Sequence, residues 1–254
     1  MLRPKNNKTK PRIKHRPFLK WAGGKFRLTD DLNRVFPKRK QCLIEPFVGA
    51  GAVFLNSHFE RYILADINPD LINLFNIVKE NVDAYIEACK PIFFAENANT
   101  AEYYYAQRDA FNQSADPFER SVLFLYLNRF GFNGLCRYNS KNEFNVPFGA
   151  YKTHYFPEDE LRYFAHKAQS AVFLCADFQQ TFELADKHSV IYCDPPYAPL
   201  PQDTNFTGYA GNAFGLEHQK NLAECAKKAQ KEKQISVVIS NHDTKFTREI
   251  YKGA

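Results

Sequence analysis

Residues 190–197 constrain the fold most, because an apolar, β-rich run ends there in an acid, two prolines and an aromatic ring. Proline lacks the backbone N–H that a β-ladder requires, so the strand must end before Pro195. Open α/β sheets bind their ligands at the carboxyl ends of strands, which makes Asp194, Pro195, Pro196 and Tyr197 candidate catalytic residues. A carboxylate and a free proline carbonyl beside an aromatic plate suit a planar ring that bears an exocyclic amine. The alternative is a strand end followed by a proline turn, in which Asp194 only caps a helix.

Two earlier apolar runs, at residues 42–45 and 62–66, also end in an acidic residue. The first ends at Glu45 and continues through Gly49 and Gly51 into a helix-like stretch, the pattern of the nucleotide-binding turn in doubly wound sheets. Phe54 stands where the dinucleotide fingerprint requires glycine or alanine, which argues against NAD. Asp66 follows Gly51 by fifteen residues, near the spacing at which an acid binds ribose hydroxyls. The alternative is that Asp66 only caps the following helix.

Residues 17–25 combine Trp21, the only tryptophan, with Gly23, Gly24 and Lys25. Adjacent glycines let a backbone approach a ligand closely, so Lys25 can meet an anionic group and Trp21 can cover an aromatic ring. The spacing does not match a phosphate-binding P-loop. The alternative is a tight turn before a helix.

The charge distribution points to a polyanionic partner. Residues 1–40 contain fourteen Lys and Arg residues against Asp30 and Asp31, a local net charge of +12, so the remainder of the +6 chain carries −6. A basic arm on a mildly acidic body is typical of proteins that bind nucleic acid. The alternative is a solvated tail, and we expect residues 1–16 to be disordered.

Composition places the chain among ordinary globular proteins, with 44% hydrophobic and 24% charged residues. No apolar run approaches the ~20 residues that span a bilayer, and the basic N-terminus lacks the apolar core of a secretory signal. The six cysteines are scattered without a C-x-x-C pair, which favours reduced thiols in a cytoplasmic protein over disulfides or zinc. We therefore expect neither a membrane nor a metal as a partner.

Strands and helices alternate at both ends of the chain, and helical patterns alone fill the middle. This order predicts an α/β fold with a doubly wound, Rossmann-like sheet and an inserted, mainly helical domain, in the units 1–68, 69–157 and 158–254. In the insert, helices are expected at 82–89, 101–111 and 117–130, the last with one strong apolar face. Beyond it we expect a helix at 158–168, strands at 171–175 and 190–193, a helix at 216–231, a buried strand at 236–240 and a helix at 244–251. Residues 198–215 are expected to form a mobile loop over the site.

Residues 128–149 are too polar for a core and too aromatic for a linker. Arg and Asn side chains pair bidentately with guanine and adenine edges, and aromatic rings can wedge into a base stack. The polar residues that cluster here are Arg129, Asn133, Arg137, Asn139 and Asn145. We interpret the segment as a DNA reader. The alternative is a β-hairpin whose polar side chains are satisfied internally.

With these motifs in this order, the sequence resembles the Dam family of DNA adenine-N6 methyltransferases, which belongs to the α group of amino-methyltransferases. The resemblance runs from Phe18 onward and rests on residues 18–25, 45–51, 129–148 and 194–197 and on the strand ending at Asp66. It implies S-adenosylmethionine as the cofactor and methyl transfer to N6 of adenine in duplex GATC. The implied enzyme is a monomer that acts in the cytoplasm, on the nucleoid.

The resemblance also assigns roles residue by residue. The cofactor contacts that it implies are Trp21, Lys25, Asp66 and Asp194, to which the glycine-containing turn adds Glu45, Gly49 and Gly51. The base-reading positions are Lys20, Leu135, Arg137 and Pro147, and those that enter the stack are Phe132 and Asn133. The phosphate-contacting positions are Arg108, Arg129, Asn139, Asn145 and Lys152. Phe132 replaces a tyrosine of the family, so we expect stacking to be kept and a hydroxyl contact to be lost.

The expected chemistry is a direct transfer. If Asp194 and the Pro195 carbonyl accept hydrogen bonds from both N–H groups of the adenine amine, the nitrogen lone pair is freed to attack the methyl group in line. The base must first be flipped out of the duplex, and Tyr197 is expected to stack on it. One alternative is a methyltransferase that acts on a protein glutamine or an RNA amine. Another is a catalytically impaired DNA-binding protein, because the sequence stops at Ala254 where the family usually continues into a final strand pair, leaving an exposed sheet edge.

Overall fold

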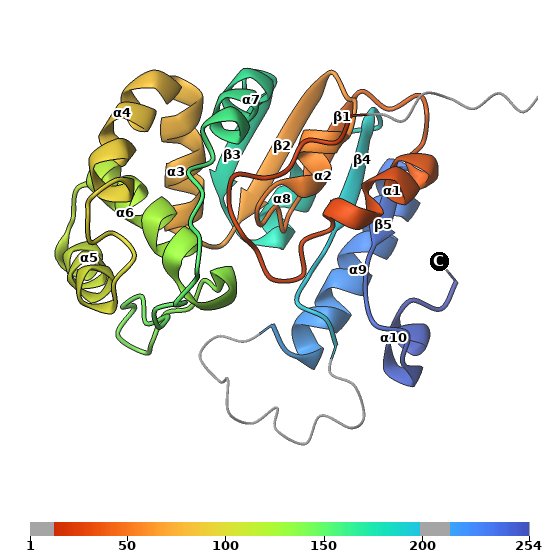
Figure 1. Cartoon of the computed structure of the whole chain (residues 1–254). Helices are drawn as coiled ribbons and strands as arrows, with labels where there is room; N and C mark the ends of the chain where they lie inside the picture. Colours follow the sequence, from red (N-terminus) through yellow and green to blue (C-terminus); the bar gives the residue numbers. More distant parts are fainter. Residues whose placement is uncertain (1–12, 199–213, 254) are drawn as a thin grey trace, which may run out of the picture.

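The computed structural model describes residues 13–198 and 214–253, and its strands form one five-stranded sheet (Figure 1). The strands are β1 (Cys42–Glu45), β2 (Arg61–Asp66), β3 (Ala171–Cys175), β4 (Ser189–Cys193) and β5 (Ser236–Ile239). Their order is β3-β2-β1-β4-β5, and every neighbouring pair is parallel. The order of connection reverses between β1 and β4, which is the place where open sheets bind ligands. The predicted α/β fold with a parallel sheet is confirmed.

Helices cover both faces of the sheet. Successive side chains of a strand point to opposite faces, and apolar strand residues belong to two separate cores. On one face, Leu43 and Tyr192 share a core with residues of α2 (Ala52–Asn56) and α7 (Glu158–Ala168). On the other face, Ile44 and Ile191 pack with residues of α8 (Phe178–Glu183) and α9 (Leu216–Lys233). The shorter helical elements are η1 (Phe26–Leu28), α1 (Thr29–Val35), η2 (Phe132–Gly134) and α10 (Lys245–Ile250).

A group of helices lies beside the β3 edge of the sheet (Figure 1). In it, α3 (Pro69–Glu80), α4 (Val82–Phe93) and α5 (Ala101–Gln113) all pack against α6 (Pro117–Phe130). The expectation of one apolar face on 117–130 is wrong, because residues 121–128 are all buried. A helix surrounded by three others has no solvent-facing side over most of its length, so an amphipathic pattern does not apply. Since α3 also contacts β2 and β3, these helices share one core with the sheet.

Some helices extend further at their carboxyl ends than the sequence predicts. The helix expected at 82–89 continues as α4 to Phe93, although Pro91 lies inside it. A proline disfavours the helical conformation of the residue before it, but Phe93 is fully buried against Tyr126 and Phe130 and stabilises the last turn. The helix expected at 216–231 likewise continues to Lys233.

The strand at the other edge of the sheet differs from the expectation in its burial. Residues 236–240 were expected to be buried, whereas all four residues of β5 are half-buried because only β4 pairs with this edge strand. The basic arm at residues 1–12 and most of the loop expected at 198–215 lie outside the described residues. Among the helices that the structure describes, none is both long and apolar enough to cross a membrane.

Candidate functional site

A cleft of about 1020 Å³ opens at the carboxyl ends of β1, β2 and β4. It brings together most of the residues predicted from the strand ends and from the Trp–Gly–Gly–Lys stretch. The predicted residues that line it are Trp21, Lys25, Glu45, Gly49, Asp66, Asp194, Pro195, Pro196 and Tyr197. Their convergence follows from the parallel sheet, because the carboxyl ends of neighbouring parallel strands meet at the same edge.

Asp194 follows the last residue of β4 and is paired with Lys25. Lys25 Nζ lies 2.7 Å from Asp194 Oδ2 and 4.8 Å from the centre of the Tyr197 ring. Burial raises the pKa of Asp194, and the Lys25 ammonium lowers it in part. The other carboxylate oxygen, Oδ1, is buried and has no hydrogen-bond partner within the described residues. Asp194 therefore keeps one oxygen ready to accept a hydrogen bond from a ligand.

The loop after Asp194 is held from behind by residues that the sequence analysis did not select. Gln219 Nε2 donates to the Pro196 carbonyl at 2.7 Å, and Gln219 Oε1 accepts from Asn241 Nδ2 at 2.8 Å. Asn241 Oδ1 accepts from the Ala198 N–H at 3.0 Å. The signal that could have found Gln219 is its place on the buried side of α9, with Leu222, Ala223 and Ala229.

His242 completes this support. Its Nδ1 lies 2.8 Å from the Ala198 carbonyl oxygen, and its ring packs edge-on against Tyr197 with a centroid distance of 4.9 Å. The Pro195 carbonyl makes no hydrogen bond with the rest of residues 13–198 and 214–253. The loop thus presents the Asp194 carboxylate and a Pro195 carbonyl without a partner among the described residues. Both lie beside the Tyr197 ring, against which His242 packs.

Asp66 ends β2 and organises the adjoining wall of the cleft. Its carboxylate accepts hydrogen bonds from the N–H groups of Gly49 and Asn68, both at 3.1 Å. Burial raises the pKa of Asp66, and these N–H groups lower it in part. The helix cap that the alternative interpretation assigns to Asp66 is supplied by Asn68, whose side chain accepts from two N–H groups of α3. Asp66 is thereby left facing the cleft.

Trp21 lies across the glycine-containing turn. A Cβ atom added to Gly49, which has φ of +48°, would lie 2.8 Å from Trp21 Nε1. Only glycine permits this contact in this backbone conformation. Gly51 is not among the residues that line the cleft; its φ of +74° makes the turn into α2. Gly49 therefore lies in the cleft and Gly51 lies outside its lining, and the cofactor-binding role of both glycines stays a prediction.

Glu45 lies in the floor of the cleft and is only 2% exposed. Burial, and the negative charge of Asp194, hold its pKa well above the ordinary value. Its Oε1 has no hydrogen-bond partner among the described residues. Two residues that line the cleft, Glu45 and Asp194, thus each have a buried carboxyl oxygen without a hydrogen-bond partner in the described part of the chain.

An aromatic group at the far end of the cleft was missed by the sequence analysis. The rings of Phe47, Phe178 and Phe214 lie within 5.4–5.8 Å of one another, and all three line the cleft. Asp177, which caps α8, lies beside them in the wall. The available signal was another acid after a strand, since Asp177 follows β3 by two residues.

The predicted reader segment forms a second region next to the cleft. Lys20 Nζ donates to the Arg129 carbonyl at 2.7 Å and lies 3.8 Å from the centre of the Tyr151 ring. Burial and the Arg129 charge lower the pKa of Lys20 to about 8. A Cβ atom on Gly134, which has φ of +60°, would clash with Lys20 Cβ. This close approach joins residue 20, next to Trp21, to the segment that follows α6.

The residues predicted to enter a base stack lie at the surface. Phe132 is 46% exposed, and its N–H donates to the Pro147 carbonyl at 2.9 Å. Asn133 is exposed with φ of +52°, and its N–H donates to the Tyr151 hydroxyl at 2.7 Å. Leu135 is half-buried beside them.

The segment is also a small hairpin, as its alternative interpretation expected, with antiparallel bridges between Gly131 and Phe148 and between Tyr138 and Phe144. Asn139 Oδ1 accepts from the Glu143 N–H at 3.0 Å and so closes the hairpin turn. Exposed Arg137 donates from Nε to Asn145 Oδ1 at 2.7 Å. A hairpin with internal hydrogen bonds and a reading surface are compatible, because Arg137 remains at the surface.

The basic residues predicted to contact phosphate differ in exposure. Lys152 is exposed, whereas Arg108 and Arg129 are half-buried and each has a buried Nε without a partner in the described residues. Their guanidinium groups lie 4.6 Å from the Tyr105 ring centre and 5.4 Å from the Tyr155 ring centre, respectively. Burial lowers the pKa of Arg129. A half-buried cation with unused donors is suited to an anionic ligand.

Within the residues that the structure describes, no group of three or more His, Cys, Asp or Glu side chains is placed to hold a metal ion.

Comparison with known proteins agrees with this geometry. The sequence model of the D12 class N6 adenine-specific DNA methyltransferases matches residues 21–254. The DNA adenine methylase of Haemophilus influenzae is 82% identical over 254 residues, which cover 100% of this chain and 89% of that protein. The DNA adenine methylases of Vibrio cholerae and Escherichia coli are 60% and 59% identical over 241 residues, which cover 95% of this chain and 86% of each protein. The chain therefore belongs to the family of D12 class N6 adenine-specific DNA methyltransferases.

Proposed function

We propose that the chain transfers a methyl group from S-adenosylmethionine to N6 of adenine in duplex GATC, after the adenine has been flipped into the cleft. The observation that carries the proposal is the pair of free acceptors at the end of β4. Within residues 13–198 and 214–253, buried Asp194 Oδ1 has no hydrogen-bond partner and the Pro195 carbonyl accepts no hydrogen bond, and both lie beside the Tyr197 ring. The relatives, all called DNA adenine methylases, and the order of motifs support DNA as the substrate.

The residues around the cleft fit the proposed cofactor. Asp66 offers a carboxylate for ribose hydroxyls, and the glycine turn at Gly49 permits close approach of the backbone. Trp21 offers an aromatic surface, and polar contacts near Asp194 are offered by Lys25 and by the Glu45 oxygen that has no partner among the described residues. When bound, the cofactor supplies an electrophilic methyl group on a positively charged sulfur.

The residues of the loop prepare the amine for transfer. An adenine amine is a poor nucleophile, because its lone pair is delocalised into the ring. Asp194 Oδ1 and the Pro195 carbonyl accept hydrogen bonds from the two N–H groups of the amine, so the nitrogen can pyramidalise and direct its lone pair into the cleft. Tyr197 stacks on the flipped base. Asp194 acts as an acceptor held in place by Lys25, and the proton leaves to water after the transfer.

The proposed DNA-binding residues extend this site across residues 69–157, which we call the helical unit. We propose Lys20, Leu135, Arg137 and Pro147 as base readers, Phe132 and Asn133 as the pair that enters the stack, and Arg108, Arg129, Asn139, Asn145 and Lys152 as phosphate contacts. Residues 69–157 are then a target-recognition domain inserted between catalytic units 1–68 and 158–254. We propose that the enzyme acts as a monomer.

Transfer of a labelled methyl group to short duplexes tests the proposal. A duplex with one GATC site should accept label, and the same duplex with its adenine replaced should not. DNA from cells that express the chain should also resist nucleases blocked by GATC methylation. Label that enters a protein glutamine or single-stranded RNA instead would favour the other amine substrates. DNA binding without any transfer would favour a catalytically impaired binding protein.

A further inference from the structure

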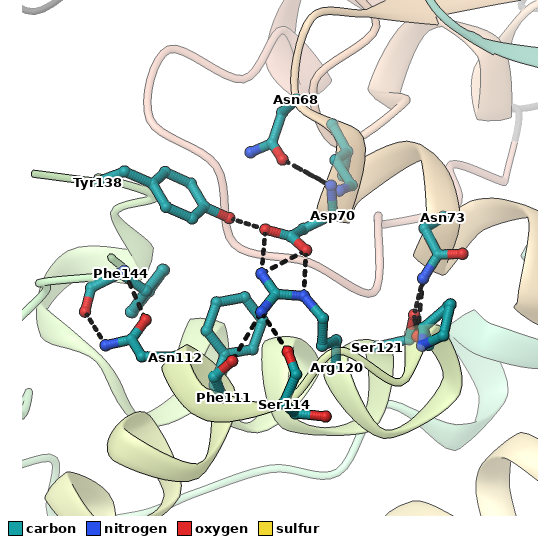
Figure 2. A network of polar contacts seen from close by, with 12 residues as sticks. Asn68, Asp70, Asn73, Phe111, Asn112, Ser114, Arg120, Ser121, Tyr138 and Phe144 are labelled. Atoms are coloured by element: carbon teal, nitrogen blue, oxygen red, sulfur yellow. Dashed lines mark hydrogen bonds and ion pairs between the residues drawn. The ribbon is translucent and has the colours of Figure 1, made fainter. Parts of the chain in front are cut away.

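A polar network lies where α6 and the end of α5 meet the first turn of α3, and Figure 2 shows Asp70 at its centre. Asp70 Oδ2 accepts a hydrogen bond from the Tyr138 hydroxyl at 2.6 Å. Arg120 donates to the same carboxylate from Nε at 2.9 Å and from Nη2 at 3.0 Å. The Arg120 and Asp70 side chains are 22% and 12% exposed, so water competes little for these bonds. A two-bond contact of this kind fixes the orientation of the carboxylate.

Arg120 is itself fixed by the helical unit. Its Nη1 donates to the carbonyl oxygens of Phe111 at 2.7 Å and Ser114 at 3.0 Å, at the end of α5 (Figure 2). Its guanidinium lies 4.1 Å from the centre of the Phe111 ring. The network therefore ties α5, α6 and the start of α3 to one carboxylate.

Tyr138 attaches the reader hairpin to that carboxylate. Burial raises the pKa of Tyr138, so its hydroxyl remains protonated and can donate. Two residues earlier, Cys136 Sγ lies 3.2 Å from Asn68 Nδ2, so it also contacts the cap of α3. Side chains alternate along an extended segment, and Arg137, between these two attachments, is exposed on the opposite side.

The other arm of the hairpin is anchored as well. The Phe144 N–H donates to Asn112 Oδ1 at 2.7 Å, and Asn112 Nδ2 donates to the Phe144 carbonyl at 3.1 Å (Figure 2). Phe144 forms the bridge with Tyr138. Asn145, next along this arm, holds the Arg137 guanidinium through its side chain at 2.7 Å and its carbonyl at 3.1 Å. Both arms that set the Arg137 position are thus fixed to the helical unit.

We propose that Tyr138, held by Asp70 and Arg120, is a positioning residue that aims Arg137 at its base pair and so contributes to sequence discrimination without touching DNA. The inference rests on the proposed role of Arg137 as a base reader. A guanidinium recognises guanine only when both donors meet O6 and N7 together. A small tilt of the hairpin therefore weakens discrimination, although the charge that attracts the DNA backbone is unchanged.

Tyr138→Phe removes only the hydroxyl and tests the inference. Methylation rates are measured on a GATC duplex and on duplexes in which an outer G·C pair is replaced. The ratio of these rates should fall about 3- to 10-fold, the worth of one lost hydrogen bond. Affinity for a duplex without GATC should stay within about twofold of that of the unmodified chain, because non-specific DNA binding depends on the positive charges, which are unchanged. Asp70→Asn, which keeps an acceptor for Tyr138 but breaks the ion pair, should give a similar loss.

Tyr85→Phe is the matched control. The Tyr85 hydroxyl is fully buried and donates to the Ser121 carbonyl at 2.8 Å, in the same helical unit but away from the hairpin. This variant should lose stability without a change in the ratio of rates. Thermal denaturation of both variants separates a loss of stability from a loss of discrimination.

The outcomes separate this inference from the function on which it rests. The inference would be overturned if Tyr138→Phe left the ratio of methylation rates unchanged, for example by slowing methylation equally on all duplexes. The role of Arg137 as a base reader would still stand in that case if Arg137→Ala lowered the ratio. A ratio lowered by Tyr138→Phe but not by Arg137→Ala would overturn it too, because the network would then position another group. If the unmodified chain methylates no DNA, both the positioning role of Tyr138 and the proposed function are wrong.

Discussion

Gln219→Leu tests whether the loop that follows Asp194 is held in place from behind. Gln219 is fully buried, donates to the Pro196 carbonyl at 2.7 Å and accepts from Asn241 Nδ2 at 2.8 Å. Leucine has a similar volume but can form neither bond. The substitution therefore leaves the Pro196 carbonyl and the Asn241 amide without these partners.

The expected loss of stability follows from these two groups. Each buried polar group left unsatisfied costs about 1–3 kcal/mol, and burial of an apolar side chain offsets part of this, so we expect a net loss of about 2–4 kcal/mol. For a chain of this size, the midpoint of thermal unfolding should fall by roughly 4–16 °C. The loop also carries the reacting groups, and since displacement by 1 Å can cost about 100-fold, kcat should fall about 10- to 100-fold.

Thermal unfolding and kcat at saturating cofactor and DNA measure the two effects separately. Gln169→Leu is the control, because the Gln169 amide donates to two carbonyl oxygens, those of Lys79 and Ala165, both at 3.0 Å, but the residue lies exposed at the C-terminal cap of α7. Water can replace those bonds, so stability should change by less than about 0.5 kcal/mol. Its kcat should equal that of the unmodified chain.

A Gln219→Leu variant that is destabilised yet keeps its kcat would refute the reasoning, because the loop would then hold its position without Gln219. A variant unchanged in both properties would show that the two hydrogen bonds carry no net free energy.

Three further predictions concern the cleft and the reader segment. Asp194→Ala should abolish methyl transfer while the unfolding midpoint stays near that of the unmodified chain, and turnover above about a hundredth of normal would exclude Asp194 from the reaction. Lys25→Met should move the acidic limb of the kcat profile to higher pH, because burial raises the pKa of Asp194 and the Lys25 ammonium opposes that rise more strongly than the Tyr197 hydroxyl does; Lys90→Met, which removes a remote ion pair with Glu87, should leave the profile unchanged. Gly134→Ala should lower stability by about 1–3 kcal/mol, since its φ is +60° and the new Cβ would meet Lys20, and chemical denaturation with no change would contradict this.

The sequence by itself determined the strands, their direction and the acids at their carboxyl ends. β1, β3 and β4 match their expected ranges within one residue. The signals are local: short β-branched runs, a following acid, and then glycine or proline that cannot continue a strand. Because parallel strands end at one edge, these local signals were sufficient to place Glu45, Asp66 and Asp194 in a single cleft.

Tertiary structure alone decided which side chains meet across the cleft and the hairpin. Lys25 and Asp194 are 169 residues apart, and their ion pair depends on how the stretch before α1 crosses the end of β4. Arg120, Asp70 and Tyr138 come from α6, α3 and the hairpin, and periodicity describes each element but not the packing between elements. Gln219 appears in the sequence only as one polar residue on a helix, and its function as a support for the Pro196 loop exists only after α9 packs against the sheet. Such contacts follow from the summed packing of distant elements, which no local pattern encodes.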